Sequence, residues 1–380
     1  MLLTHLNLID MHHKPFHLKY RPSTIADLIG QPIIQATLGN AIKSNKIANA
    51  YLLEGGRGTG KTSTARILAK SLNCLAQDSP TITPCGNCLN CKSIENSNSM
   101  DVFELDAASN NGVDDIRRLI DSAQLSRMQA RYRVFLMDEV HFISRSGQAA
   151  LLKTLEEPPQ GVVFLLCTTD PEKLSEPIIS RCLHLRFGRI GAGDIAKRLA
   201  HIAVREKIDV SNEAIHAIAS LSKGGMRDAL QTLEQLSTLG IGKPLNVDDV
   251  RQCFKQARSE QLLEIVKGVL SGDVGMLMME SHALIEQGLD PQSILEDLLA
   301  IYRDLYVLDL CGREGNQANV PLISSLSREL LRKLLPLGSH TQIEAGLEAL
   351  QKSEAELKYS PNAAIWLEIC LLRLASSGVF

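Results

Sequence analysis

A glycine-rich stretch, EGGRGTGKTS at residues 54–63, has the residue types and spacing of a phosphate-binding loop. The pattern Gly55-x4-Gly60-Lys61-Thr62 follows an apolar run and precedes a helical pattern, which is the context such a loop requires. The glycines let backbone N–H groups turn inward around phosphates, and the helix N-terminus adds partial positive charge. The sequence therefore predicts a nucleotide site made of Gly55, Gly56, Arg57, Gly58, Thr59, Gly60, Lys61, Thr62 and Ser63.

Two acidic residues, Asp138 and Glu139, follow the apolar segment 134–137. Beside a phosphate loop, the first acid can hold Mg²⁺ together with the hydroxyl of Thr62, and Lys61 can reach the β- and γ-phosphates. The second acid can orient an attacking water. Taken alone, the pair fits a solvated strand end equally well, but together with the loop it favours hydrolysis over mere binding.

Four of the nine cysteines lie within eighteen residues, at Cys74, Cys85, Cys88 and Cys91. Four thiolates suit tetrahedral Zn²⁺, and the absence of a histidine in the cluster favours a closed structural site over a catalytic one. An iron–sulfur cluster and free thiols are the alternatives. The other five cysteines are single and lie mostly in apolar runs, where a place in the core is the default interpretation.

Strands and helices alternate in the first half of the chain. Because each apolar strand ends in polar residues, we expect an open parallel α/β sheet with its site at the carboxyl ends of the strands. An irregular insertion is expected at residues 75–92, and beyond about residue 190 the pattern becomes helical. The predicted strands are residues 50–55, 101–107, 133–140 and 162–170.

The overall composition excludes several classes of protein. The 380 residues carry a net charge of −3, so contact with nucleic acid should be local or shared with partners. No apolar run reaches the roughly 18 residues of a membrane span, and the first ten residues lack the basic region of a signal peptide. We therefore expect a cytoplasmic protein.

With these features in place, the sequence resembles the gamma/tau family of bacterial DNA polymerase III, the ATPases of the sliding-clamp loader. The resemblance is close from about residue 15 to about residue 240 and looser beyond, where KYSPNAAIWLEICLLRLA (358–375) still fits the last collar helix. Besides the loop and the cysteines, it rests on KYRP (19–22), DLIGQ (27–31), ELDAASNNGVDDIR (104–117), VFLMDEVH (134–141), LLKTLEEPP (151–159), LLCTTDPEKL (165–174), SRC (180–182) and GGMRDAL (224–230).

The resemblance implies an AAA+ P-loop ATPase built from several parts. An N-terminal arm (1–18) would precede an α/β nucleotide domain (19–190) that contains a zinc module (74–91). An all-α lid (191–240) and an all-α collar for oligomerisation (247–380) would follow. Because the chain ends after the collar, the resemblance is to the shorter, gamma-type form.

The resemblance also assigns roles to residues. Lys61 and Thr62 would hold phosphate and metal, Asp138 would hold Mg²⁺, and Glu139 would position water. Thr169 would sense the γ-phosphate, with Thr168 as the alternative, and Arg181 would be an arginine finger that reaches a neighbouring subunit. Arg227 would be the lid arginine, and Tyr20, Arg21 and Ile29 would lie at the adenine. Arg117 and Arg118 would lie either at DNA or on a solvated helix face.

The function implied is that of an ATPase subunit of the DNA polymerase III holoenzyme, with ATP, Mg²⁺ and Zn²⁺ bound. ATP would assemble a ring with copies of the chain and with delta- and delta-prime-type subunits, and the ring would open a sliding clamp. Primer–template DNA would then trigger hydrolysis. A non-motor clamp-loader paralogue and another AAA+ DNA remodeller, such as a Holliday-junction motor, are the alternatives. The intact loop and acidic pair favour the motor subunit.

Overall fold

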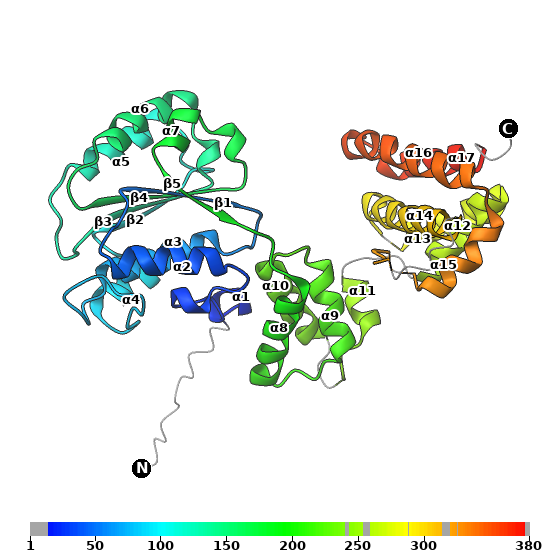
Figure 1. Cartoon of the computed structure of the whole chain (residues 1–380), viewed down its shortest axis with the longest axis horizontal. Coiled ribbons are helices and arrows are strands. Elements are labelled where there is room, and N and C mark those ends of the chain that lie inside the picture. The colour runs from blue at the N-terminus through cyan, green and yellow to red at the C-terminus, as the bar shows by residue number, and fades with distance from the viewer. Residues whose placement is uncertain are drawn as a thin grey trace, which may run out of the picture. The chain divides into compact units, whose positions relative to one another are not determined.

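The computed structural model describes residues 14–239, 243–253, 259–287, 289–313, 320–324 and 326–376. The chain divides into two compact units, Met1–Asn246 and Val247–Phe380 (Figure 1). The first contains a sheet and a group of small helices, and the described part of the second is helical.

A parallel sheet of five strands organises the described part of the first unit, in the order β2-β3-β4-β1-β5. The central strand β4 is buried along its whole length, as expected of a parallel strand covered on both faces. Because all strands run the same way, their carboxyl ends meet at one edge. There Asp106 of β2 lies opposite Asp138 in the register of the neighbouring strand β3. The strands are β1 (Ala50–Gly55), β2 (Val102–Asp106), β3 (Arg133–Asp138), β4 (Val162–Thr168) and β5 (Leu183–Phe187).

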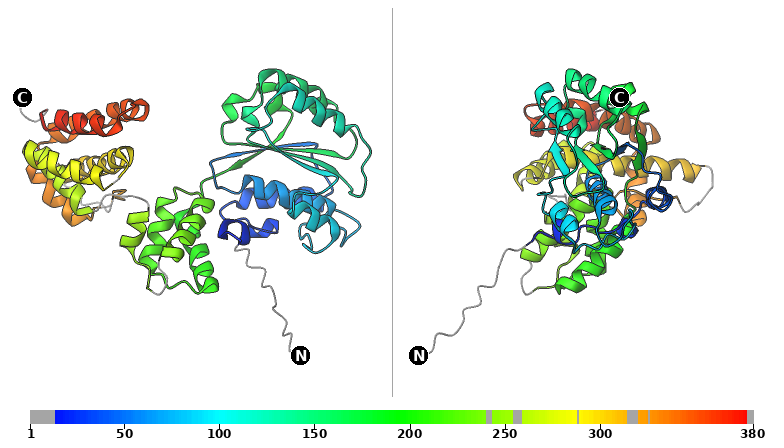
Figure 2. Two further views of the ribbon diagram at one scale, coloured as in Figure 1. Left: turned by 180° about the vertical axis from the view of Figure 1, so that it is seen from behind. Right: turned by 90° about the vertical axis from the view of Figure 1, so that its left-hand side faces the viewer.

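Helices cover both faces of this sheet (Figures 1 and 2). On one face, α2 (Pro32–Lys43) and α3 (Lys61–Asn73) pack in a core that includes Leu53 of β1. On the other, α5 (Val113–Ala123) and α6 (Arg145–Glu156) pack in a core that includes the adjacent Leu52. Successive side chains of a strand point to opposite faces, so β1 contributes to both cores.

The structure differs from the sequence-based expectations at several elements. Strand β5 was not predicted, because its exposed and buried residues alternate as in an edge strand and its apolar run is short. Helix α4 (Leu89–Glu95) begins inside the segment expected to be irregular. The short helix α1 (Phe16–Lys19) spans the expected boundary of the arm at residue 18, with Phe16 buried, and residues 1–13 of that arm lie outside the described residues.

Three helices follow the sheet in the first unit and confirm the helical pattern expected there. They are α8 (Ala192–Glu206), α9 (Asn212–Leu221) and α10 (Met226–Leu239). Ile195 and Leu199 of α8 are fully buried, and so is Leu233 of α10. After α10, residues 240–242 lie outside the described residues, and Leu245 forms a single β-bridge with Val210.

The second unit has its own hydrophobic core. Leu298, Ile301 and Tyr302 of its longest helix pack there with residues such as Leu350 and Leu371. The helices are α11 (Val247–Cys253), α12 (Ser259–Ser271), α13 (Val274–Glu286), α14 (Pro291–Arg313), α15 (Arg328–Leu334), α16 (His340–Tyr359) and α17 (Ala363–Ser376).

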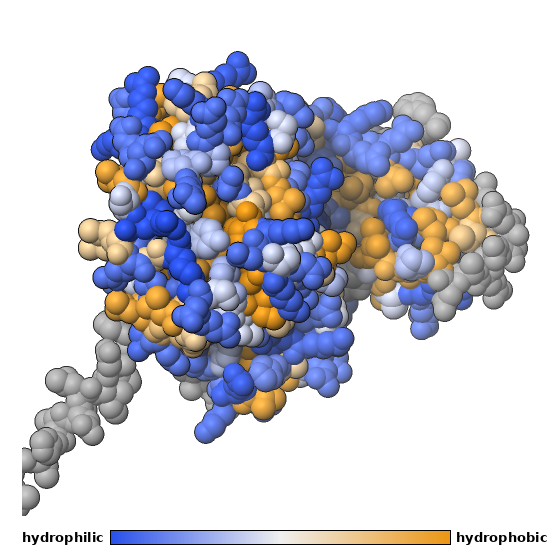
Figure 3. Space-filling model, turned by 60° about the vertical axis from the view of Figure 1, so that its left-hand side comes forward, coloured by the Kyte–Doolittle hydropathy of each residue, from blue (hydrophilic) through white to orange (hydrophobic). Residues whose placement is uncertain are grey.

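Exposed large hydrophobic residues are spread along the described chain, for example Ile33, Met128 and Val204. Figure 3 shows hydrophobic areas interspersed with hydrophilic ones on the face that it draws. Among the described residues, no helix combines the length and the apolar character that crossing a bilayer demands.

Candidate functional site

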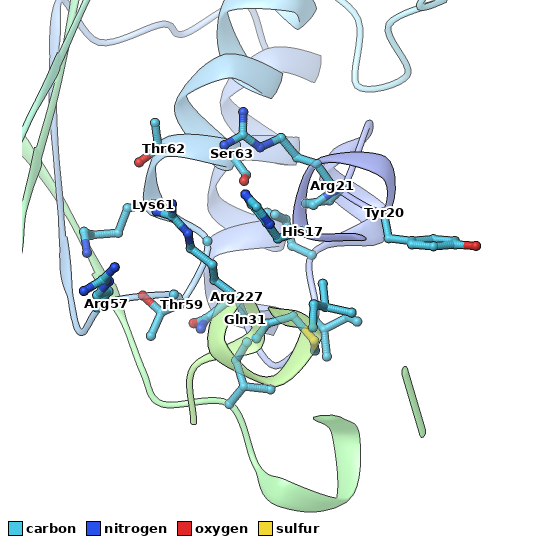
Figure 4. Close-up of a pocket in the computed structure, with 18 of the residues that line it drawn as sticks. His17, Tyr20, Arg21, Gln31, Arg57, Thr59, Lys61, Thr62, Ser63 and Arg227 are labelled. Carbon is cyan, nitrogen blue, oxygen red and sulfur yellow. The ribbon is translucent and has the colours of Figure 1, made fainter. Parts of the chain in front are cut away.

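A pocket of about 240 Å³ opens in the first unit at the carboxyl edge of the sheet. Three groups of residues converge on it in Figure 4: the N-terminal segment, the glycine-rich loop and the helix that carries Arg227. The end of β3, with Asp138 and Glu139, and the loop from β5 to α8, with Ile190, complete its wall. The pocket therefore gathers residues more than 200 positions apart in the sequence, from His17 to Leu230.

The glycine-rich loop connects β1 to α3 as predicted. Gly60 adopts a φ of +104° immediately before the helix, a conformation that side chains disfavour. Lys61 begins α3, is only 6% exposed, and its Nζ donates to the carbonyls of Gly55 and Gly56 at 2.8 and 2.9 Å. Burial lowers the pKa of Lys61, while the nearby Glu139 carboxylate opposes that shift. The ammonium group is thus held against the first residues of the loop.

Oxygen ligands suited to a hard cation lie together beside Lys61. The Thr62 hydroxyl donates to Oδ2 of Asp138 at 2.8 Å, so two of the predicted Mg²⁺ ligands are adjacent. Mg²⁺ prefers a few protein oxygens and completes its shell with water and substrate phosphates, which fits this pair at the open end of the pocket.

Glu139 and Thr169 meet at the ends of neighbouring strands. Thr169 Oγ1 donates to Oε2 of Glu139 at 3.2 Å. Thr168, the alternative sensor, is fully buried and bonds to the ring of His141. The structure therefore brings Thr169, and not Thr168, to the carboxylate beside the pocket.

Helix α10 closes the pocket with main-chain and side-chain groups. Arg227 lines the pocket, as the resemblance implied. The N–H of Met226 donates to the carbonyl of Gly58 at 3.1 Å, which ties the loop directly to the helix. Gly58 has a φ of +74°, and a Cβ there would lie 3.1 Å from the Cα of Gly225. Only glycine fits this approach without strain.

The residues expected at the adenine all line the pocket, namely Tyr20, Arg21 and Ile29. The ring of Tyr20, however, points away from the other labelled side chains (Figure 4), and its hydroxyl donates to Glu206 of α8. Lys19 pairs with the same carboxylate at 2.6 Å, and Arg198 of α8 donates to the carbonyl of Tyr20 at 3.2 Å. The N-terminal segment is thereby fastened to the helices that follow the sheet.

Three of the arginines singled out in the sequence lie outside the pocket lining. Arg181 follows the short helix α7 (Glu176–Ser180), donates to the carbonyl of Pro177 at 2.8 Å and pairs with Glu156. Arg117 and Arg118 pair with aspartates one turn earlier on α5, at 3.3 and 2.7 Å. Both arginines are exposed, as either interpretation of them requires.

Sequence reasoning missed three polar residues near the site. His17 lines the pocket, and its buried Nδ1 has no hydrogen-bond partner among the described residues. Gln31 is buried and exchanges two hydrogen bonds with the backbone of Gly188, at 2.8 and 3.2 Å. His141 is buried directly behind the acidic pair. Gln31 and His141 belong to motifs already recognised, but nothing in their spacing indicates these contacts.

The four clustered cysteines also meet in the fold. Their Sγ atoms all lie within 4.8 Å of one another. Four sulfurs around one Zn²⁺ would be about 3.8 Å apart at the usual bond length, so the arrangement fits a tetrahedral ion after small adjustments. Cys74 and Cys91 are buried and Cys85 is exposed, which places the cluster at the surface of the unit.

Backbone N–H groups point at these sulfurs. Cys74 Sγ accepts from the N–H of Cys85 at 3.3 Å, and Cys85 Sγ accepts from that of Cys88 at 3.3 Å. Such donors favour the thiolate, and those from Asn87 and Cys88 lower the pKa of Cys85 to about 6. Arg131 donates to the carbonyls of Leu72 and Gln77 at 3.0 and 2.7 Å, and it also bonds the carbonyl of Cys74. This anchors the cluster to the end of α3.

A phosphate loop on a five-stranded parallel sheet, followed by helices that close over the pocket, defines an AAA+ P-loop fold with a four-cysteine insertion. Three family models match the chain in succession: "DNA polymerase III, delta subunit" at 30–191, "DNA polymerase III clamp loader subunit, ATPase lid domain" at 194–242, and "DNA polymerase III subunits gamma and tau domain III" at 245–379.

Curated relatives carry the same names. The gamma subunit of DNA polymerase III from Buchnera aphidicola of Acyrthosiphon pisum is 35% identical over 97% of this chain and 100% of its own length. The tau subunits of Bacillus subtilis and Escherichia coli are 35% and 36% identical over 97% and 93% of this chain. The chain spans 64% and 54% of those tau subunits. The chain belongs to the gamma/tau family of DNA polymerase III subunits.

Solved structures with a similar fold include the Holliday junction branch migration motor RuvB of Thermotoga maritima. It is 19% identical, has a TM-score of 0.47 and covers 66% of this chain and 79% of its own. The clamp loader delta protein of Bacillus subtilis is 14% identical, with a TM-score of 0.36 over 90% of this chain and 99% of its own.

Proposed function

We propose that the chain is an ATPase whose hydrolysis drives the loading of a sliding clamp onto primed DNA. One observation carries the ATPase part of this proposal. Lys61, Thr62, Asp138, Glu139 and Arg227 lie around one pocket at the carboxyl edge of the sheet, although they come from three distant segments. The coincidence of all these groups favours hydrolysis over a scaffold that only binds nucleotide.

In the proposed reaction, each group acts on a different part of bound ATP. The N–H groups of the loop and the start of α3 receive the phosphates, and Lys61 leaves its loop carbonyls to contact the β- and γ-phosphates. Glu139 accepts a proton from the attacking water, and Thr169, which donates to that carboxylate in the free chain, senses the γ-phosphate. Thr62 and Asp138 would hold Mg²⁺, which would supply positive charge against the phosphates. Arg227 brings positive charge from α10.

Arg181 is proposed to act on the nucleotide of a neighbouring subunit. It lies outside its own chain's pocket lining and on the surface, with its side chain 34% exposed. An arginine supplied from outside stabilises the transition state only once the neighbour has docked, so hydrolysis depends on assembly. Within the free chain, the carboxylate of Glu156 holds it.

For the four-cysteine cluster we propose Zn²⁺ with a structural role. Four sulfurs leave no open ligand position, and a tetrahedral sulfur set is typical of closed zinc sites. The cluster would fix the segment between α3 and α4, in which the structure describes no helix or strand from residue 75 to residue 88. Metal content of the purified chain, expected at about one Zn²⁺ per chain, tests this role.

The clamp-loading part of the proposal rests on the family. The matched models name a clamp loader lid and the domain III of gamma and tau. We accordingly propose residues 19–190 as the nucleotide domain, 191–240 as the lid and 247–380 as the collar. The proposed partners are copies of the chain, delta- and delta-prime-type subunits, the sliding clamp and primer–template DNA, in the cytoplasm.

The test is ATP hydrolysis by the full chain mixed with delta-type subunits, with and without sliding clamp and primed DNA. Strong stimulation by clamp and primed DNA together is expected. Hydrolysis that ignores both would retain the ATPase and contradict clamp loading. ATP binding without turnover under any condition would support the non-motor paralogue instead.

Arg181→Ala sharpens that experiment. We expect ATP binding by the isolated variant to match that of the wild-type chain, while stimulated hydrolysis falls by about 100-fold or more. Arg205→Ala, at an exposed arginine of α8 outside the pocket lining, is the matched control for a lost surface charge. Full stimulated turnover in Arg181→Ala would remove it from the proposed role.

A further inference from the structure

A buried histidine lies directly behind the acidic pair. His141 belongs to the short 3-10 helix Val140–Phe142 that follows Glu139, and its side chain is only 3% exposed. Its ring packs on Phe142 with centroids 4.3 Å apart. A buried imidazole normally has partners for both nitrogens, since an unmet polar group costs stability.

The two nitrogens of His141 face residues on the ends of different strands. Nδ1 lies 3.1 Å from Oγ1 of Thr168 and 3.5 Å from Oε2 of Glu139. Nε2 lies 3.5 Å from Oδ2 of Asp170. The Thr168 hydroxyl also accepts the N–H of Asp170 at 3.1 Å. The ring therefore bridges the turn after β3 and the turn after β4.

Glu139 needs such support. Its backbone is left-handed, with φ 47° and ψ 46°, which costs a residue with a side chain about 1–2 kcal/mol. Its Oε2 accepts from Thr169 and lies next to His141, whereas Oε1 has no hydrogen bond within the described part of the chain. One oxygen is thus held by Thr169 and His141, while the residue itself lines the pocket.

We propose that His141 is a positioning residue that fixes the carboxylate of Glu139 for activation of water and links its orientation to the end of β4. The inference rests on the proposed ATP hydrolysis. In that step the water oxygen bonds to the γ-phosphorus, its proton passes to Glu139, and the bond to the β-phosphate oxygen breaks with its electron pair leaving on ADP. His141 touches none of these atoms and acts only through Glu139.

A merely structural role predicts different behaviour. If His141 only filled space, His141→Phe would change folding stability and ATP affinity together. It would do so equally in the wild-type chain and in a chain with a substitution at Glu139. If it positions Glu139, the loss falls on turnover, because a misplaced catalytic group weakens the transition state more than the ground state. His141→Asn, which can keep a polar atom near the place of Nδ1, should then recover part of the activity.

The experiment is a double-mutant cycle on the full chain with its partner subunits, clamp and primed DNA. His141→Phe should lower kcat about tenfold and leave ATP affinity within about twofold. In the Glu139→Gln background, the same change should have no further effect on kcat. His201→Phe, at an exposed histidine of α8, is the control for the exchange itself.

Three results would overturn the inference: unchanged kcat in His141→Phe, an equal loss in the Glu139→Gln background, or no recovery in His141→Asn when that variant is folded. Should His141→Phe fail to fold, the cycle is run with His141→Gln, which lacks the ring but keeps a polar atom toward Asp170. Absence of turnover in the wild-type chain under every condition would overturn both this inference and the proposed hydrolysis. If the wild-type chain turns over ATP normally, any of the three results above contradicts only the role of His141.

Discussion

The nucleotide pocket and the four-cysteine cluster lie at opposite ends of one helix, and they are built in contrasting ways. Lys61 begins α3 and Cys74 directly follows its last residue, so about 18 Å of helix separates the two ends. The pocket draws its residues from the N-terminal segment, the sheet edge and α10. The cluster takes all four sulfurs from one stretch of eighteen residues.

This contrast determines what each site depends on. The pocket exists only when the sheet and the helices after it are folded and packed, because no single segment carries it. The cluster depends on few contacts beyond its own segment, such as those that Arg131 makes to its first turn. We therefore expect the cluster to be sensitive to metal and the pocket to be sensitive to the packing between the loop and α10.

The largest expected effect is on the pocket side. Lys61→Ala should reduce ATP hydrolysis by on the order of 1,000-fold, because the buried ammonium is the group that we propose contacts the transferred phosphate. The cluster should keep the proposed Zn²⁺ in this variant. Steady-state turnover and zinc content measure both, with the exposed Lys46→Ala as control. Metal loss in Lys61→Ala would show that the two ends of α3 are not independent.

Removal of the proposed Zn²⁺ should act on the other end of α3. Chelation, or Cys88→Ser, should lower the free energy of local unfolding of the segment from Cys74 to Glu95 by several kcal/mol, because metal binding contributes directly to folding at such sites. ATP affinity should stay within about threefold, because the loop is a helix length away. Hydrogen exchange and ATP titration measure the two effects. Cys311→Ser, a single cysteine on α14, should change neither.

A smaller effect is expected where the loop meets α10. Gly58→Ala places a Cβ at a φ of +74° and 3.1 Å from Gly225, so it should cost about 1–3 kcal/mol and weaken ATP binding by a corresponding factor. Gly39→Ala is the matched control, because its Cβ meets nothing within 4 Å on α2, where alanine stabilises by about 0.5–1 kcal/mol. Thermal unfolding and ATP titration compare them, and equal behaviour of the two variants would contradict the close approach.

The smallest effect is expected at the N-terminal segment. Tyr20→Phe removes the hydroxyl that bonds Glu206 and leaves the ring, so stability should fall by no more than about 1 kcal/mol. ATP affinity should change little, since the hydroxyl points away from the pocket (Figure 4). A large loss of affinity would instead mean that Tyr20 turns inward to hold the base.

The sequence predicted those parts of the structure whose signals are local. The loop, the acidic pair and the cysteine cluster each have a spacing with a chemical meaning, and the apolar runs of β1, β3 and β4 predicted buried parallel strands. Strand β5 was missed because an exposed edge strand has no such run. The contacts of Gln31 with Gly188 and of His141 with Asp170 join residues that only the fold brings together.

The bond between the N–H of Met226 and the carbonyl of Gly58 has a consequence for how such a protein can diverge. Both partners are main-chain atoms, so apart from proline at 226 no exchange of side chain removes the donor or the acceptor. The connection from the loop to α10 can therefore persist while the residues around it drift, provided that position 58 stays small. The close approach of the loop to α10 would then be preserved by the backbone and not by any one side chain.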